Sequence, residues 1–272
     1  AFIFLFMPFS IMVSLRYLTQ PLFAFLLMLS VWWWLLYLNT KRNKFLYNTA
    51  ILLPLIALVR PIAIWLPVPF LIGLLVFSRR GWLKPAVVIL IVFVAGLAHW
   101  CYRNYKQIGS YSLSTMRAFQ LYYYDLPPVL ALARHISYEE AREFLIEEIR
   151  PHLIAPPDTY VSSDILNEHS IAYLKQYRVS AAISRIPLLI SFFTRDGVHY
   201  WFDEFLLKRN FFAMLAERAV MGAFLIGVAT AAVRFPFIAL IIAYFALLSG
   251  AVSSAGLRFP VEPLIILLGL IG

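Results

Sequence analysis

The chain has 272 residues, of which 62% are hydrophobic and 14% are charged. Soluble globular domains carry about 25% charged residues, so this composition excludes an ordinary soluble domain. The formal net charge is +9, yet 12 of the 23 basic and 12 of the 14 acidic residues lie within 102–210, so the basic excess lies beside the apolar segments. This distribution follows the positive-inside rule and suits anionic membrane lipids, and we expect no nucleic-acid partner.

The sequence lacks the motifs of soluble enzymes and metal sites. Cys101 is the only cysteine, which excludes an intrachain disulfide and a multi-cysteine metal site. The five histidines are scattered, and no His-Glu-x-x-His, Gly-x-Gly-x-x-Gly or P-loop pattern is present, so we expect neither a metal nor a cofactor. The sequence begins at Ala1 and ends at Gly272 inside apolar stretches, and we expect it to be a fragment of a longer chain.

The first complete membrane span is predicted at 20–38. Its last turns carry an aromatic belt typical of a membrane–water interface, formed by Trp32, Trp33, Trp34 and Tyr37. A basic cluster follows, made of Lys41, Arg42 and Lys44. We place this cluster in the cytoplasm by the positive-inside rule.

The next apolar stretch, 48–77, ends in a second basic cluster at Arg79, Arg80 and Lys84. Because both ends are expected in the cytoplasm, the stretch must cross twice or not at all, and it is too short for two full spans. Pro61 disfavours a helical conformation at Arg60. We therefore predict a hairpin of two short helices with its apex at Arg60 and Pro61, facing a cavity.

A span at 85–101 then leads to the polar region 102–210, which we expect outside the cytoplasm. Ser137 and Glu140 have the spacing of a capping box and predict a helix through Glu148 that ends at Pro151. A second helix is predicted at 163–192, with basic residues on one face as expected beside lipid headgroups. Further spans are predicted at 211–233 and 235–253, and a truncated one follows 258–263.

These segments predict an all-α polytopic membrane protein with about six transmembrane helices, including the broken short-helix hairpin, and a mainly helical extracytoplasmic insert. We expect three parts: transmembrane helices at 1–101 with the hairpin at 48–77, an extracytoplasmic loop domain at 102–210 with interfacial helices, and C-terminal transmembrane helices at 211–272.

Several polar residues beside the predicted spans are candidates for binding a substrate: Arg60, Arg103, Asn104, Tyr122, Tyr123, Arg258 and Glu262. A guanidinium inside a membrane is costly and suits a phosphate, although Arg60 could instead pair with Glu217 or Glu262. Arg103 could be an interfacial anchor. The tyrosines could form a membrane-surface belt, or their hydroxyls could line a sugar site. Arg258 and Glu262 could form a salt bridge. Asp125 and Glu262 are possible acids that we expect to be structural.

The order of four motifs resembles the C-terminal two-thirds of a GT-C class membrane glycosyltransferase, in the group of bacterial protein mannosyltransferases and aminoarabinose transferases. The motifs are SLRYLTQPLF at 14–23, ALVRP at 57–61, WCYRNY at 100–105 with Gly109, Ser114 and Thr115, and LRFPVEP at 257–263. The family typically has Glu where Gln20 stands. Its catalytic acid lies in a first outer loop that this sequence lacks, so the resemblance identifies no catalytic residue here.

The resemblance implies transfer of a sugar from a polyprenyl-phosphate donor to a lipid, glycan or protein acceptor on the outer face of the bacterial inner membrane. Two other functions fit parts of the sequence. A flippase or transporter of polyprenyl-linked glycans would also use broken helices and a cationic cavity, but it needs no neutral outer region like 102–210. A membrane scaffold would leave Arg60 unexplained.

Overall fold

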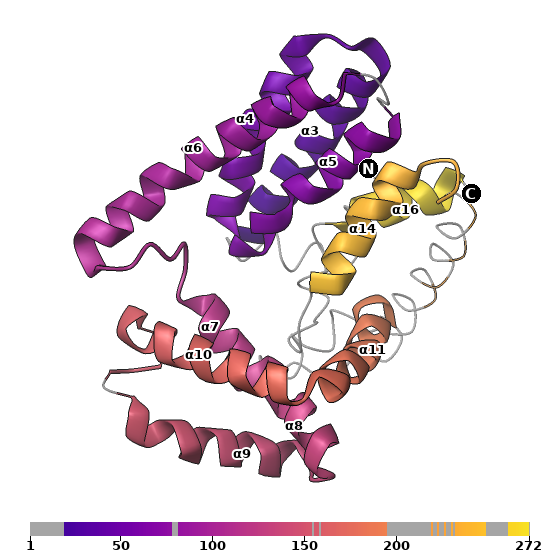
Figure 1. Ribbon diagram of the computed structural model, residues 1–272. Helices are drawn as coiled ribbons and strands as arrows, with labels where there is room; N and C mark the ends of the chain where they lie inside the picture. The colour runs from indigo at the N-terminus through magenta and orange to yellow at the C-terminus, as the bar shows by residue number, and fades with distance from the viewer. Residues whose placement is uncertain are drawn as a thin grey trace. The chain divides into compact units, whose positions relative to one another are not determined.

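The computed structural model describes residues 19–77, 81–153, 155–157, 159–194, 232–248 and 261–271, with the single residues 219, 222, 226 and 230. Every regular element in these ranges is helical, which confirms the all-α prediction (Figure 1). The chain forms two compact units. Unit 1 comprises Ala1–His99, Phe192–Leu248 and Ser254–Gly272, and unit 2 comprises Trp100–Ser191 and Ser249–Ser253.

Two helices in the described part are long and apolar enough to cross a membrane. They are α3 (Thr19–Thr40, 22 residues) and α6 (Leu83–Ile108, 26 residues). At about 1.5 Å per residue, each exceeds the roughly 30 Å of a bilayer's hydrocarbon core. The other apolar helices described in unit 1 are shorter, so the structure supports membrane association through two candidate spans.

The predicted interruption at Arg60 is confirmed. Helix α4 (Asn43–Val59) ends there because Arg60 has an extended backbone, with φ −144° and ψ 118°. A 3-10 turn, η1 (Pro61–Trp65), follows, and α5 (Pro67–Phe77) continues the chain. Helix α4 begins at Asn43, earlier than the predicted residue 48.

Aromatic pairs show that α14 (Pro236–Leu248) runs antiparallel to α3. Phe23 near the start of α3 contacts Phe245 near the end of α14, with ring centroids 5.8 Å apart. Trp34 near the end of α3 contacts Phe237 near the start of α14, at 6.0 Å. Trp34 is fully buried, and Tyr37 is also buried, so these two belong to the core and not to the interfacial belt that we expected.

Helix α5 also runs antiparallel to α14. The Phe70 ring lies 5.2 Å from that of Phe237, and the Tyr244 hydroxyl donates to the Ile62 carbonyl at 2.7 Å. Since α3 and α4 pack against each other across a two-residue connection, α4 runs opposite to α3 and therefore opposite to α5. The chain thus reverses direction at Arg60 and η1, as the hairpin prediction requires (Figure 1).

These directions bring the described basic residues of unit 1 other than Arg60 to one end. Lys41 and Lys44 lie between α3 and α4, Lys84 begins α6, and Arg234 precedes α14. Arg60 lies at the opposite end of α4. Arg79 and Arg80 lie outside the described residues. Among the described residues of unit 1, the basic side chains other than Arg60 thus share one end, the kind of distribution from which the positive-inside rule predicts a cytoplasmic side.

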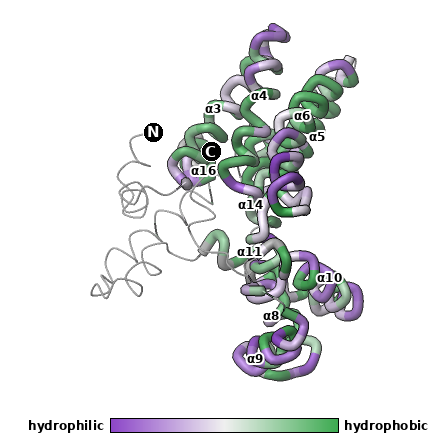
Figure 2. The backbone as a smooth tube through the Cα atoms, turned by 90° about the vertical axis from the view of Figure 1, so that its left-hand side faces the viewer, coloured by the Kyte–Doolittle hydropathy of each residue, from purple (hydrophilic) through white to green (hydrophobic). Residues whose placement is uncertain are grey.

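Unit 2 is built from amphipathic helices around its own core. Continuous helix runs through α7 (Met116–Gln120), the π-helical segment η2 (Leu121–Asp125) and α8 (Leu126–Arg134), and packs with α9 (Tyr138–Ile149) and α10 (Tyr160–Gln176). The buried residues of this hydrophobic cluster are Ala118, Tyr122, Leu126, Leu130, Ala141, Leu145, Ile149 and Leu166. Figure 2 shows α4 and α5 as mostly hydrophobic and α9 as largely hydrophilic.

The capping box of α9 is confirmed. The Glu140 N–H donates to Ser137 Oγ at 3.2 Å, and the Ser137 N–H donates to Glu140 Oε2 at 2.8 Å. Helix α9 ends at Ile149, before the turn η3 (Arg150–His152) that contains Pro151.

The single helix that we predicted at 163–192 is wrong. Two helices, α10 and α11 (Arg178–Thr194), meet at Tyr177, whose φ of −112° and ψ of 47° are not helical. The Arg178 guanidinium donates to the Lys175 carbonyl at 3.2 Å, and the Tyr177 ring stacks on Tyr173. Local side-chain contacts therefore stabilise this break, although the sequence has no proline or glycine there.

Candidate functional site

Arg60 is a half-buried cation at the apex of the hairpin. Pro61 restricts the residue before it to extended conformations, and this ends α4 at Arg60. Among the residues that the structure describes, none forms an ion pair with the guanidinium, and desolvation is the main influence on it. The alternative of a structural pair with Glu262 is therefore not observed, and Glu217 lies outside the described residues.

The main chain at the apex is held by one hydrogen bond within the turn and one from α14. The Arg60 carbonyl accepts from the Ala63 N–H at 3.0 Å, and the Ile62 carbonyl accepts from the Tyr244 hydroxyl at 2.7 Å. Irregular backbone inside a membrane protein persists where protein groups satisfy its polar atoms. These bonds fix the turn while leaving the Arg60 side chain available to an anion.

Glu262 begins α16 (Glu262–Ile271) and is 1% exposed. A carboxylate in the first turn of a helix is stabilised by the positive end of the helix dipole. This placement accounts for a buried acid without a catalytic role. The predicted salt bridge to Arg258 concerns a residue outside the described ranges.

Arg103 and Asn104 occupy the last turns of α6, within unit 2. The Arg103 guanidinium is exposed and lies 4.8 Å from the centroid of the Trp100 ring, a cation–π contact that fits an interfacial anchor. Asn104 is buried, and its Nδ2 donates to the Ser112 carbonyl at 2.9 Å. Asn104 thus holds the segment after α6 against the helix, which is a structural role.

Tyr122 belongs to the core of unit 2. Its side chain has no exposed surface, and its hydroxyl donates to the Leu145 carbonyl at 2.8 Å and lies 3.5 Å from Glu148 Oε2. The Tyr173 hydroxyl donates to the same Glu148 oxygen at 2.8 Å. Burial, followed by the Glu148 charge, raises the pKa of Tyr122 well above 10.0. Tyr122 thus lies in the core of unit 2, and its side chain has no exposed surface with which to line a sugar site.

Tyr123 differs from its neighbour because it is only half-buried. Its ring packs on Phe119, with centroids 4.8 Å apart, and on Tyr122 at 5.3 Å. Burial raises the pKa of the Tyr123 hydroxyl, so the group is a neutral hydrogen-bonding side chain at physiological pH. It remains a candidate contact for a polar substrate.

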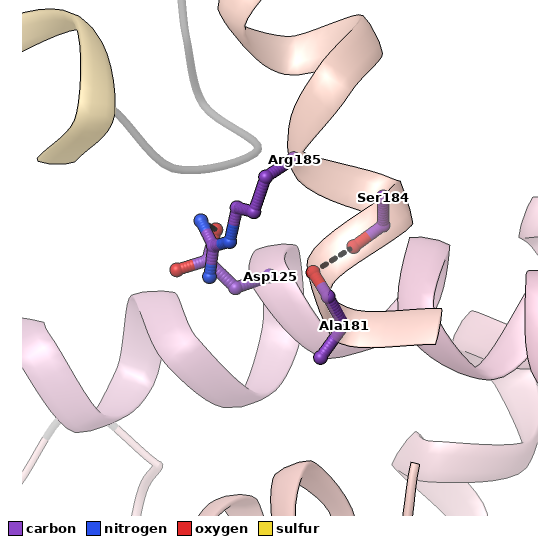
Figure 3. Close-up of polar contacts among 4 residues, drawn as sticks. All are labelled: Asp125, Ala181, Ser184 and Arg185. Atoms are coloured by element: carbon purple, nitrogen blue, oxygen red, sulfur yellow. Dashed lines mark hydrogen bonds and ion pairs between the residues drawn. The ribbon is translucent and has the colours of Figure 1, made fainter. Parts of the chain in front are cut away.

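Asp125 ends the π-helical segment and pairs with Arg185 of α11. Oδ1 of Asp125 lies 3.4 Å from Nη1 of Arg185, and the side chains are 16% and 37% exposed (Figure 3). This pair joins η2 to α11 and supports the structural role that we expected for Asp125. A π-helical turn often marks a functional site, but here its final residue serves packing.

The sequence interpretation missed Glu148 and Tyr173. Glu148 follows Leu145 by three residues, so it lies on the inner side of α9 and offers a polar atom to the core. That spacing indicates a buried acid. Its two tyrosine partners could not be predicted from the spacing, because they lie 25 and 26 residues away in sequence.

Within the ranges given above, no group of three or more His, Cys, Asp or Glu side chains is arranged to hold a metal ion. No protein-family model matches the sequence, and no curated protein or solved structure is significantly similar to it.

Proposed function

We propose that the protein is a multi-pass enzyme of the bacterial inner membrane that transfers a sugar from a polyprenyl-phosphate donor to an acceptor at the outer face. The observation that carries this proposal is Arg60, a half-buried guanidinium at a helix break that pairs with no described acid. About six spans, with the region 102–210 outside, are part of the proposal.

A cation in an apolar segment needs a compensating anion. Insertion of an arginine at the centre of a membrane helix costs roughly 2.5–3.5 kcal/mol. Such a residue usually faces a cavity or a charged group, and the planar guanidinium matches phosphate oxygens in a bidentate geometry. The phosphate of a lipid-linked donor supplies this anion at a membrane depth that soluble phosphates do not reach.

The order of the GT-C-like motifs then suggests what happens to the bound phosphate. In this chemistry a carboxylate deprotonates the acceptor hydroxyl, the hydroxyl oxygen attacks the anomeric carbon, and the lipid phosphate departs. Arginines stabilise the negative charge that develops on the leaving phosphate. We assign this role to Arg60, with Arg103 and Arg258 as alternative candidates, and the resemblance assigns the carboxylate to no residue described here.

A flippase or transporter is the second candidate, because a cation at a broken helix also suits transport. Unit 2 favours the transferase. It has a hydrophobic core of its own and covers Trp100–Ser191, which is more protein than a lipid-translocating bundle requires outside the membrane.

Substitution of Arg60 tests the proposal. In membranes containing the complete protein, we expect Arg60→Ala to lower sugar transfer about ten- to a hundredfold, the equivalent of losing charge-assisted hydrogen bonds of about 1.5–3 kcal/mol. Arg60→Lys should retain part of the activity, since it keeps the charge and loses the bidentate geometry. Arg142→Ala is the matched control, because that arginine is exposed on α9 and its ion pair with Glu139 is 3.9 Å long.

Expression level and detergent-soluble yield should be the same for all three variants. A folded Arg60→Ala protein that transfers sugar at the parental rate would refute the phosphate role. Movement of the intact labelled donor across vesicle membranes, without product formation, would instead support the flippase.

A further inference from the structure

Tyr244 of α14 reaches the turn that carries Arg60. Its hydroxyl donates to the Ile62 carbonyl at 2.7 Å, although the two residues are 182 positions apart in sequence. Ile62 is the second residue of η1 and lies two positions after Arg60. Both partners belong to unit 1, so this bond ties the hairpin apex to a helix that is distant in sequence.

The apex needs such a tie because a short 3-10 turn is weakly held by its own bonds. The Arg60 N–H donates to the Ile56 carbonyl at 3.0 Å and closes the last turn of α4, while the Arg60 carbonyl accepts from the Ala63 N–H, also at 3.0 Å. Pro61 lies between these bonds and has no N–H to donate. A 3-10 turn has poorer hydrogen-bond geometry than an α-helix. The direction of Arg60 therefore depends on what holds η1.

Helix α14 can hold η1 because the core of unit 1 fixes the helix near both of its ends. Phe245 directly follows Tyr244, is buried, and contacts Phe23 of α3 edge to face. Near the start of α14, Phe237 is also buried and contacts Phe70 of α5. Aromatic contacts thus hold the helix at two points along its length, and the Tyr244 hydroxyl is presented to the apex from a rigid support.

The exact placement of Arg60 matters for binding an anion. A guanidinium is planar, and it forms two parallel hydrogen bonds with phosphate oxygens only in a defined orientation. A displacement of the Ile62 peptide moves Arg60, because only Pro61 lies between them and peptide groups are rigid. Where two groups must meet in a defined geometry, a misplacement of about 1 Å can cost a hundredfold in rate.

We propose that Tyr244 is a positioning residue for Arg60. Its hydroxyl holds η1 in the place that directs the Arg60 guanidinium toward the phosphate of a lipid-linked substrate. This inference rests on the phosphate role of Arg60 in the proposed function, and it adds a residue of α14 to that site. It does not depend on what happens to the phosphate afterwards, so it applies to transfer and to transport alike.

Phosphate binding by the complete protein tests this proposal. Farnesyl phosphate is the probe, and farnesol, which has the same chain without the phosphate, reports the binding that needs no cation. Native mass spectrometry of the detergent-solubilised protein resolves the free and bound forms and gives an apparent Kd for each ligand. Tyr244→Phe removes the hydroxyl and keeps the ring. Tyr47→Phe is the matched control, because Tyr47 is 50% exposed and lies near the start of α4, at the end away from Arg60.

We expect Tyr244→Phe to raise the apparent Kd of farnesyl phosphate about two- to tenfold, the effect of losing one neutral hydrogen bond, and to leave that of farnesol unchanged. Arg60→Ala should raise the Kd of farnesyl phosphate further. In an Arg60→Ala background, Tyr244→Phe should have no additional effect, because the group that it positions is gone. Tyr47→Phe should bind both ligands as the parent protein does.

Parental affinity for farnesyl phosphate in Tyr244→Phe, with weakened binding in Arg60→Ala, would overturn the positioning role and leave the phosphate role intact. An additional loss in the Arg60→Ala background, or an equal loss of farnesol binding, would also overturn it, because a general structural defect acts in that way. Parental affinity in Arg60→Ala would refute the phosphate role and the positioning role with it. The expected pattern of binding in a protein that transfers no sugar would support the positioning role and count against the transferase.

Discussion

Tyr122, Tyr173 and Glu148 form a hydrogen-bonded group in which two phenols approach one carboxylate oxygen. Buried polar groups stabilise a fold only when they are satisfied, because an unsatisfied one keeps its desolvation cost. The Tyr122 hydroxyl satisfies the Leu145 carbonyl as well, so one phenol links the π-helical segment to α9. A residue with this function has no surface left for a ligand.

Tyr122→Phe should therefore lower the free energy of unfolding by about 0.5–1.5 kcal/mol, since it removes the buried hydrogen bond that the hydroxyl donates to the Leu145 carbonyl. Tyr123→Phe is the matched control. Thermal unfolding in detergent, followed by circular dichroism, measures both. Equal unfolding temperatures for the two variants would contradict the assigned role.

The same substitution should change the response to alkaline pH. The pKa of Tyr122 is raised above 10.0 in the folded protein, so the unfolded chain loses this proton first, and stability is lost as pH rises above 10. Tyr122→Phe has no such proton. The difference in the free energy of unfolding between this variant and the parent protein should therefore become smaller above that pH.

At the scale of elements, α4 and α6 approach closely at one point. A methyl group built on Gly96 would lie 2.7 Å from Cβ and 2.8 Å from Cγ of Pro54. Pro54 lies inside α4, where its ring removes a main-chain donor and adds bulk. The absence of a side chain at Gly96 allows α6 to pack against this ring.

Gly96→Ala should consequently destabilise the packing of the two helices by about 1–3 kcal/mol, as overpacking of a tight contact does. Gly222→Ala is the control, because an added methyl there meets no atom within 4 Å. Retention of monodisperse protein during heating in detergent measures the effect. If the Gly96→Ala protein is as stable as the control, the prediction is wrong, because α4 and α6 can then move apart to admit the methyl group without any loss of stability.

At the scale of the whole molecule, the orientation in the membrane follows from the basic end of unit 1. Lys41, Lys44, Lys84 and Arg234 share that end, and by the positive-inside rule we propose that it lies in the cytoplasm. Unit 2 should then be reached from outside, which the transferase proposal requires.

Single-cysteine labelling in intact cells checks this orientation in a Cys101→Ser background. We expect Glu143→Cys to react with a membrane-impermeant maleimide from outside, and Lys41→Cys to react only after the membrane is breached. Ser162→Cys should remain unlabelled throughout, because Ser162 has no exposed surface. The reverse pattern for positions 143 and 41 would overturn both the orientation and the transferase proposal.

The sequence alone determined the features that depend on neighbouring residues. The helical class follows from apolar segments of membrane-crossing length, the end of α4 from the steric effect of Pro61 on Arg60, and the start of α9 from bonds between Ser137 and Glu140. Each arises from dihedral limits or from groups within four residues of each other. Such features depend little on how the distant parts of the chain pack.

Only the tertiary structure decided which side chains are buried and which remain available. Tyr122 bonds to Leu145, 23 residues away, and Arg185 pairs with Asp125 across 60 residues. Trp34 was expected in an interfacial belt, but it is buried because Phe237, from a helix distant in sequence, packs against it. Burial depends on which segments pack together, so a short-range pattern predicts a helix and its ends but not the face that the helix presents.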